Sequence, residues 1–236
     1  MPYELADAQR AGAGRQAASA AAGLLGRLFG AHVAVRVALP GAYDAGLPPA
    51  EEACARTMVV ERRREFTAGR VCARLALDDL GGPTGPIPRS PGGRADWPAG
   101  FVGSITHCSG FCCAVAAPAS VLCGIGVDAE IAAPLDASVA HLVGGPDERR
   151  GWDGLASESV PDFGIVAFSI KEAIFKCLQS QGPAPLALTD IRFDVEERGA
   201  AAGAFRSRGP GQAARAVVRG FWIVRGGLVH TGAVWR

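Results

Sequence analysis

Lysine is nearly missing from this sequence of 236 residues. Of its 24 basic residues only Lys171 and Lys176 are lysines, and all the others are arginines. This bias, together with 32 glycines, is typical of a GC-rich genome that uses arginine wherever either cation serves. Unless the two lysines cluster by chance, their closeness indicates a place that needs a compact ammonium group and not a guanidinium fork.

A strong excess of charge and a long apolar run are both missing as well. The 24 basic residues are balanced by 23 acidic ones, for a net charge of +1, which argues against a nucleic-acid partner bound by bulk charge. No run of about 18 uncharged apolar residues occurs, so we expect no membrane span. The N-terminus carries Glu4, Asp7 and Arg10, which a signal peptide would not carry there.

The cysteines show no pattern of a metal site or of a disulfide framework. Their number, 7, is odd, and no two of them are spaced as C-x₂-C. Cys112 and Cys113 are adjacent in an apolar run, so in a strand they would face opposite sides. We therefore interpret the cysteines as reduced thiols of the core and expect a cytoplasmic protein.

Apolar residues make up 49% of the chain and charged residues 20%, which is enough for a folded core. The expected elements indicate an α+β fold, since each half holds strands and one substantial helix. No internal sequence repeat is visible, but a boundary near Ser120 would divide the chain into two lobes of similar size, 1–120 and 121–236. Little periodicity is visible over 132–164. The expected helices cover 8–30, 50–80 and 168–180, and the expected strands cover 32–39, 101–106, 111–117, 121–131, 190–195, 214–224 and 228–235.

Two carboxylates interrupt the apolar run GIGVDAE at residues 124–130. Asp128 and Glu130 are two apart, so in a strand they point to the same side. Adjacent carboxylates repel each other unless a cation or a proton lies between them, and oxygen ligands favour a hard cation such as Mg²⁺ or Mn²⁺. The alternative is a strand end at which both acids are hydrated.

The segment FSIKEAIFK, residues 168–176, holds both lysines. In a helix Glu172 and Lys176 are four residues apart and share a face, which would also suit a plain surface ion pair. Because the flanking residues are apolar nearly all round, we favour charges that line a cleft.

Two further groups of residues suit an anion. Thr106 and His107 follow a strand and offer a hydroxyl and an imidazole N–H. Arg62 and Arg70 lie eight residues apart on an expected helix, and Arg89 and Arg94 stand in the next loop, which is rich in glycine and proline. Together they make a phosphate-binding cleft plausible, although such a charge run is more often a solvated face.

Four segments in order, 62–77, 86–108, 124–130 and 168–176, resemble the 4′-phosphopantetheinyl transferases of the surfactin type, in the branch similar to enterobactin synthetase component D. The G-[IV]-D-x-E and [WF]-[SC]-x-K-E-[AS]-x-x-K motifs carry the resemblance. It implies two similar α/β lobes in one chain, a pseudo-dimer with coenzyme A between them. Phe168 and Arg89 depart from the Trp and Lys common in the family.

The resemblance implies transfer of the phosphopantetheine arm of coenzyme A to a serine of an apo acyl, peptidyl or aryl carrier protein, with release of 3′,5′-ADP and with Mg²⁺ or Mn²⁺. The enzyme is expected to be a monomer. The roles that it implies are a metal site at Asp128, Glu130 and Glu172, a base at Glu172, leaving-group neutralisation at Lys176, and coenzyme A contacts at Arg62, Arg70, Arg89, Thr106, His107 and Lys171.

Two other functions use the same residues. A relative that only binds coenzyme A or a nucleotide would show ligand binding without turnover. A metal-dependent nucleotide phosphohydrolase would use water in place of the carrier serine and would release 3′,5′-ADP without a carrier.

Overall fold

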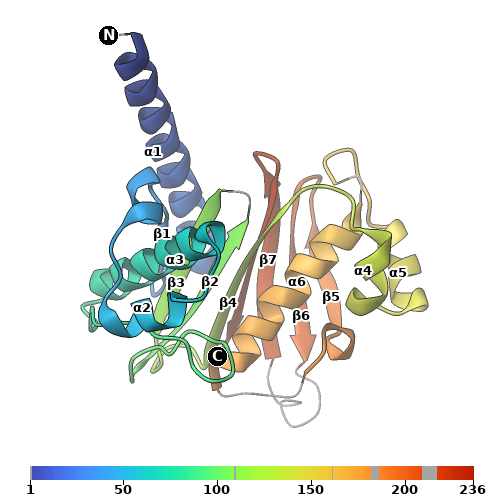
Figure 1. Cartoon of the computed structure of the whole chain (residues 1–236). Coiled ribbons are helices and arrows are strands. Elements are labelled where there is room, and N and C mark those ends of the chain that lie inside the picture. Colours follow the sequence, from blue (N-terminus) through green and yellow to red (C-terminus); the bar gives the residue numbers. More distant parts are fainter. Residues whose placement is uncertain (1, 109, 161, 182–185, 209–216) are drawn as a thin grey trace.

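Two antiparallel sheets form the middle of the molecule, and one helix lies across a face of each, as the computed structural model shows (Figure 1). The structure describes residues 2–108, 110–160, 162–181, 186–208 and 217–236. Its strands are β1 (Ala34–Val37), β2 (Phe101–Cys108), β3 (Phe111–Pro118), β4 (Gly124–Ile131), β5 (Phe193–Arg198), β6 (Ala202–Arg208), β7 (Val217–Arg225) and β8 (Leu228–Trp235).

The helices connect these strands. The α-helices are α1 (Pro2–Phe29), α2 (Pro49–Ala55), α3 (Val60–Asp79), α4 (Ala137–Val143), α5 (Pro146–Asp153) and α6 (Phe163–Leu178). Short 3₁₀ turns are η1 (Pro40–Asp44), η2 (Gln179–Gln181) and η3 (Leu188–Asp190). Among the described residues, no helix has the combination of length and apolarity that crossing a bilayer requires.

The first sheet has the strand order β1-β3-β2, and the second has the order β4-β8-β7-β6-β5. Helix α3 packs on the first sheet, helix α6 packs on β4 and β8 of the second, and α1 contacts β1 and β8. The turn between β7 and β8 uses Gly226 and Gly227 with φ of 63° and 78°, values that glycine adopts without strain. This confirms the predicted hairpin.

The two sheets meet edge to edge at β2 and β4, where hydroxyl groups take the place of backbone carbonyls. The amide of Val127 donates to Ser104 Oγ at 3.1 Å, and the amide of Ala129 donates to Thr106 Oγ1 at 3.1 Å. Buried backbone N–H groups need such acceptors. The hydroxyl residues of β2 therefore join the two halves of the molecule along one strand edge.

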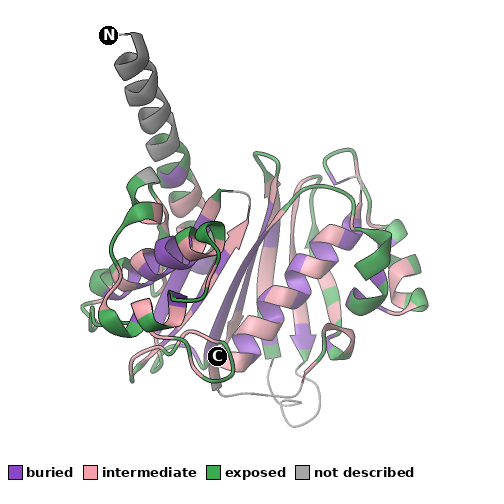
Figure 2. Ribbon diagram, viewed as in Figure 1, coloured by how far each residue is buried: buried purple, intermediate pink, exposed green. Residues whose placement is uncertain are grey.

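The faces of α3 and α6 that lie on the sheets are buried (Figure 2). Phe163, Ile170 and Ile174 of α6 are 0–1% exposed and pack on the second sheet. Leu77 and Cys72 of α3 are 0–1% exposed and pack on the first. Cys112, Cys113 and Cys177 are buried like Cys72, whereas Cys54 and Cys108 are half-buried and Cys123 is exposed.

The predicted helix over 50–80 was wrong as a single element. The chain breaks between α2 and α3, and α2 folds back so that Glu51 and Glu52 reach Arg74 and Arg63 of α3. Glu51 is fully buried and also accepts the amide of Ile87 at 2.7 Å. Neither glycine nor proline marks the break, so the helical spacing of apolar residues continues across it in the sequence.

Other predicted bounds shifted. Helix α6 begins at Phe163, five residues before the expected start, because Asp162 caps it by accepting the amide of Gly164 at 2.7 Å. Helices α4 and α5 and strand β6 were not predicted. The first three residues of the expected strand 214–224 lie outside the described residues, and β7 covers the rest.

Candidate active site

Helix α6 lies unusually close to strand β4 because two glycines make room for it. A Cβ atom built on Gly126 would overlap the carbonyl oxygen of Ala173, and one built on Gly124 would overlap that of Cys177. Only glycine permits such an approach of strand and helix backbones. These glycines of the GIGVDAE segment therefore bring the polar face of α6 onto the carboxylates of β4.

The centre of this contact is the ion pair of Asp128 and Lys176. Lys176 Nζ lies 2.6 Å from Asp128 Oδ1 and also donates to the Val127 carbonyl at 3.3 Å. The Asp128 side chain is 3% exposed and that of Lys176 is 27% exposed. Burial by itself lowers the pKa of Lys176, but the carboxylates of Asp128, Glu172 and Glu130 outweigh it, so that the pKa is raised. Lys176 thus stays charged.

Hydroxyl groups hold the Asp128 carboxylate from both sides. Ser169 Oγ donates to Asp128 Oδ2 at 2.8 Å, and Thr231 Oγ1 lies 2.9 Å from Ser169 Oγ. Thr106 Oγ1 donates to Asp128 Oδ1 at 3.3 Å while it accepts from Ala129. A carboxylate with these donors has one fixed orientation. Thr106 is 3% exposed, so the structure places it behind Asp128 and not on the cleft surface.

Glu130 and Glu172 lie in the electrostatic neighbourhood of Asp128. Burial, followed by repulsion from Asp128 and Glu172, raises the pKa of Glu130 to about 7 despite the nearby Lys176. Burial and Asp128 also raise the pKa of Glu172. Such crowding of carboxylates is relieved by a cation.

This donor set fits a hard divalent cation in its chemistry, since all three side chains offer oxygen and repel one another. Over the described parts of the chain, no three His, Cys, Asp or Glu side chains converge closely enough to form a coordination sphere by themselves. One carboxylate oxygen of Asp128 accepts from Lys176 and the other accepts from Ser169. The residues therefore fit a metal ion that a ligand brings with it or shares.

A cleft of about 510 Å³ opens beside the ion pair of Asp128 and Lys176, between the two halves of the molecule. Helix α3, strand β2 and the loop 89–97 form one wall, and the last turns of α6 with η2 form the other. The predicted residues on its surface are Arg62, Arg70, Arg89, His107 and Lys176.

The structure separates the three successive arginines of α3. Arg62 lines the cleft. Arg63 is paired with Glu52 at 2.6 Å, and Arg64 is paired with Asp44 at 2.9 Å. The sequence left these three open, and the geometry favours Arg62 as the cleft residue.

Arg70 and His107 are held in place at the base of the arginine wall. Arg70 is 6% exposed, donates from Nε to the Ile87 carbonyl at 2.6 Å and stacks 4.3 Å from the Phe66 ring centre. Burial lowers its pKa to about 10, which still leaves it charged at neutral pH. Burial and then the Arg62 cation lower the pKa of His107, so its ring is neutral near pH 7.

The structure does not bring Lys171 to the cleft, so the predicted contact of its ammonium with pyrophosphate has no support in this geometry. Its side chain is fully buried, and Nζ donates to the Val143 carbonyl at 2.7 Å and pairs with Glu148 at 2.8 Å. Neighbouring residues of an α-helix point about 100° apart, and this rotation turns Lys171 away from Glu172 and from the cleft.

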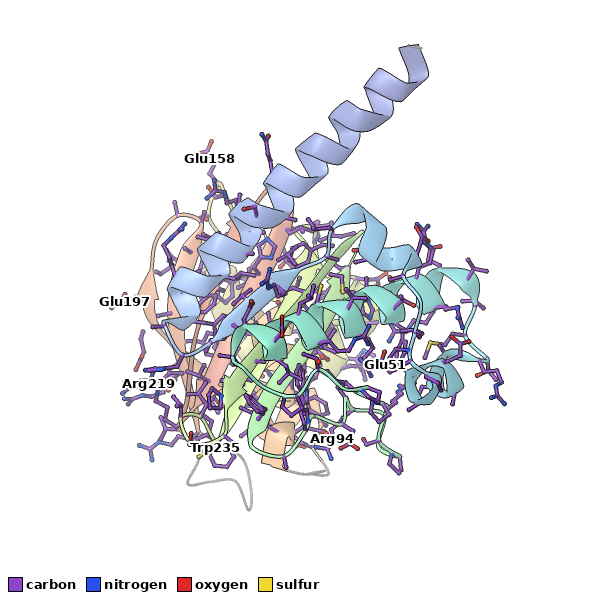
Figure 3. All side chains as sticks on the ribbon, turned by 90° about the vertical axis from the view of Figure 1, so that its left-hand side faces the viewer. Glu51, Arg94, Glu158, Glu197, Arg219 and Trp235 are labelled. Atoms are coloured by element: carbon purple, nitrogen blue, oxygen red, sulfur yellow. The ribbon has the colours of Figure 1, made fainter. Side chains whose placement is uncertain are left out.

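The sequence pointed to Arg94 together with Arg89, but it did not point to Trp97 or Ser169. Arg94 lines the cleft and its Nη1 donates to the Gln179 carbonyl at the end of α6, which ties the loop to the opposite wall (Figure 3). Trp97 lies over Gly103, where any side chain would collide with its ring. Ser169 supports Asp128. Arg94 stood out in the Gly- and Pro-rich loop, but nothing in the sequence linked Ser169 to Asp128.

Comparison with known proteins gives two family matches along the chain. Residues 50–117 match the 4′-phosphopantetheinyl transferase N-terminal domain, and residues 124–226 match the 4′-phosphopantetheinyl transferase superfamily. These ranges contain both walls of the cleft.

Three similar proteins carry names. The 4′-phosphopantetheinyl transferase Svp of Streptomyces mobaraensis is 38% identical over 78% of this chain and 76% of its own. The 4′-phosphopantetheinyl transferase Npt of Nocardia iowensis is 36% identical over 66% of this chain and 70% of its own. The 4′-phosphopantetheinyl transferase PptT of Mycobacterium tuberculosis is 34% identical over 79% of this chain and 85% of its own.

Proposed function

Because the chain belongs to the 4′-phosphopantetheinyl transferase family, we propose that it transfers the phosphopantetheine arm of coenzyme A to a serine of an apo carrier protein and releases 3′,5′-ADP. The observation that carries the proposal is the position of Lys176. Its ammonium pairs with Asp128 and lines the arginine-walled cleft at the same time. A diphosphate in this cleft would meet guanidinium groups on one wall and, on the other, the Lys176 ammonium with the Asp128 carboxylate behind it.

The cations of the cleft suit the phosphates of coenzyme A. Arg62, Arg70 and Arg89 would bind the 3′-phosphate and the adenosine end, because guanidinium groups match phosphate oxygens in geometry. His107 lies beside Arg62 on the same wall, where its neutral ring accepts from Arg62 Nη1, and it would contact a phosphate together with that guanidinium. Thr106 would serve coenzyme A binding only through Asp128, since its hydroxyl already donates to the Asp128 carboxylate.

The reaction needs one proton transfer and one exchange of bonds at phosphorus. The serine oxygen forms a bond to the phosphorus on the pantetheine side, the bond from that phosphorus to the bridging oxygen breaks, and 3′,5′-ADP leaves with the electron pair. Glu172 accepts the serine proton directly or through water, and its raised pKa makes it a stronger base. Lys176 neutralises the charge that develops on the departing phosphate.

Asp128, Glu130 and Glu172 would hold Mg²⁺ or Mn²⁺ beside the diphosphate. Such an ion supplies charge neutralisation for a phosphoryl-type transfer. The protein residues orient Asp128 for this task through Ser169 and Thr106.

The two-lobe arrangement is also part of the proposal, with lobes at 1–120 and 121–236. In each half the main helix, α3 or α6, follows the first strand, and the last strand pairs with the first, as in β1-β3-β2 and in β4-β8-β7-β6-β5. This repeated order supports a pseudo-dimer in which the first lobe holds the adenosine end and the second holds the metal and α6. We further assign the chain to the surfactin-type branch similar to enterobactin synthetase component D, on its motifs.

The test is a mass measurement. The purified protein, Mg²⁺ and coenzyme A are incubated with apo fatty-acid, polyketide and peptide carrier proteins, and a carrier that accepts the arm gains about 340 Da. Release of 3′,5′-ADP without a carrier would indicate a hydrolase. Binding of coenzyme A with neither product across all carriers would indicate a binding protein and would overturn the proposal.

A further inference from the structure

Lys171 is a charged side chain with no exposed surface, and it lies at the junction of three helices. Its Nζ donates to the carbonyl of Val143, the last residue of α4, at 2.7 Å. It pairs at 2.8 Å with Glu148 in the first turn of α5. The ring centre of Trp152, also in α5, lies 5.8 Å from Nζ. The ammonium thus closes a small cage built by α4 and α5.

Each partner in this cage is itself suited to a cation. The last carbonyls of a helix have no intrahelical donor and carry a partial negative charge. Glu148 is held from its outer side by Arg192, at 3.0 Å, and its side chain is 16% exposed. Burial lowers the pKa of Lys171, while Glu148 acts in the opposite direction. A buried charge with these partners is costly to disturb.

The cage has a direct relation to Glu172, the next residue along α6. The glycines of β4 fix the helix at Ala173 and Cys177, on the side of Glu172 toward the helix end. Lys171 fixes the same helix on the other side of Glu172, through α4 and α5. Glu172 therefore stands between two points that determine the rotation and the axial position of α6.

We propose that Lys171 is a positioning residue, which holds α6 against α4 and α5 and thereby places the Glu172 carboxylate for proton transfer. This inference rests on the proposed transfer reaction, in which Glu172 accepts the serine proton. It also explains why lysine is kept here in a chain whose other basic residues, apart from Lys176, are arginines. The closed cage suits a compact ammonium with three donors, whereas a planar guanidinium is larger.

The test compares Lys171→Arg, which keeps the charge, with Lys171→Met, which keeps most of the length. We expect kcat for arm transfer to fall about 10- to 100-fold in both, because small displacements of a catalytic group have effects of this size. The KM for coenzyme A should stay within about twofold, since the arginine wall is untouched. Glu148→Gln keeps the shape of the cage and should lower kcat about threefold to tenfold.

Two variants serve as controls. Arg192→Met removes the outer partner of Glu148. The Arg192 side chain is 64% exposed, so this variant should leave kcat unchanged. Val166→Ala removes buried volume from α6, where Val166 is 0% exposed, and leaves the polar partners of Lys171 in place. If Val166→Ala, at equal loss of thermal stability, lowers kcat as much as Lys171→Met, then Lys171 acts only through stability and the inference is overturned.

Amide hydrogen exchange over 170–176 gives a readout that does not depend on turnover. Faster exchange in Lys171→Arg and in Glu148→Gln than in Arg192→Met supports the inference, and equal exchange with unchanged kcat overturns it. Should the Lys171 variants fail to fold, Glu148→Gln decides in the same way. A wild-type protein that modifies no carrier contradicts the proposed function, while the exchange experiment still tests the placement of α6.

Discussion

The two walls of the cleft hold their charged side chains in different ways. On the wall formed by α3 and the loop, Arg62 has a side chain that is 42% exposed, and Arg89 is exposed. Behind the wall formed by α6 and η2, the Asp128 side chain of β4 is 3% exposed and is bonded on both oxygens. Exposed cations contribute binding strength, whereas buried and oriented groups contribute geometry. Changes in the first wall should therefore raise KM, and changes in the second should lower kcat.

The largest expected effect is on the second wall. Glu172→Gln removes the base while it keeps the shape, and we expect kcat to fall about 10²- to 10⁴-fold with the fold unchanged. Glu158→Gln is the matched control, because Glu158 is exposed and points away from the body (Figure 3). Single-turnover rates of carrier modification measure the difference. Equal rates for both variants would remove Glu172 from the mechanism.

The next effect comes from the close approach of β4 and α6. Gly126→Ala puts a Cβ atom into the backbone of α6 at Ala173, so we expect a loss of about 1–3 kcal/mol in the free energy of unfolding, together with a lower kcat. Gly151→Ala, on α5, meets no atom within 4 Å and should be neutral or slightly stabilising. Urea unfolding measures both variants. A neutral Gly126→Ala would mean that the helix does not lie on the strand as described.

A smaller effect is expected on the first wall. Arg62→Ala should raise the KM for coenzyme A about tenfold and leave kcat nearly unchanged, because a charge-assisted phosphate contact is lost. Arg64→Ala removes a similar cation that is paired with Asp44 and does not line the cleft, so its KM should stay at the wild-type value. A fall in kcat for Arg62→Ala without a change in KM would contradict the division of the two walls.

The smallest effect concerns stability and lies outside the cleft. His230 is 6% exposed, packs 5.0 Å from the Phe111 ring and has its pKa lowered by burial. Below the ordinary pKa of about 6.5, the unfolded chain binds a proton that the folded chain resists. The free energy of unfolding should therefore fall from pH 7 to pH 5. His230→Gln should flatten this slope, and an unchanged slope would contradict the assignment.

Much of the fold followed from patterns with a physical cause. Short apolar runs predicted β2, β3, β4 and β8, and the paired glycines predicted the last hairpin. Of the charges that residues 168–176 were expected to turn toward a cleft, Lys176 lies on its surface, but its pairing with Asp128 was not predicted from any spacing. The predicted strands and the hairpin depend on local apolar runs and on small residues, which a single sequence displays directly.

What the sequence did not show depends on contacts between distant segments. The burial of Glu51 against Arg74 breaks a continuous helical pattern, and no local residue reports it. The same is true of Lys171, whose motif suggested a ligand contact while Glu148 and Val143 draw it to the other side of α6. Tertiary partners of a charged residue decide its direction, and they lie outside any sequence window.

The central claim is that a diphosphate bound in the cleft lies between the arginine wall and the carboxylates of β4 and α6. A crystal structure with coenzyme A and Mn²⁺ tests it most directly, since anomalous scattering locates the metal. We predict that Asp128, Glu130 and Glu172 contribute oxygens to the ion and that Lys176 contacts the diphosphate. A metal or a diphosphate bound away from these four side chains would contradict the account.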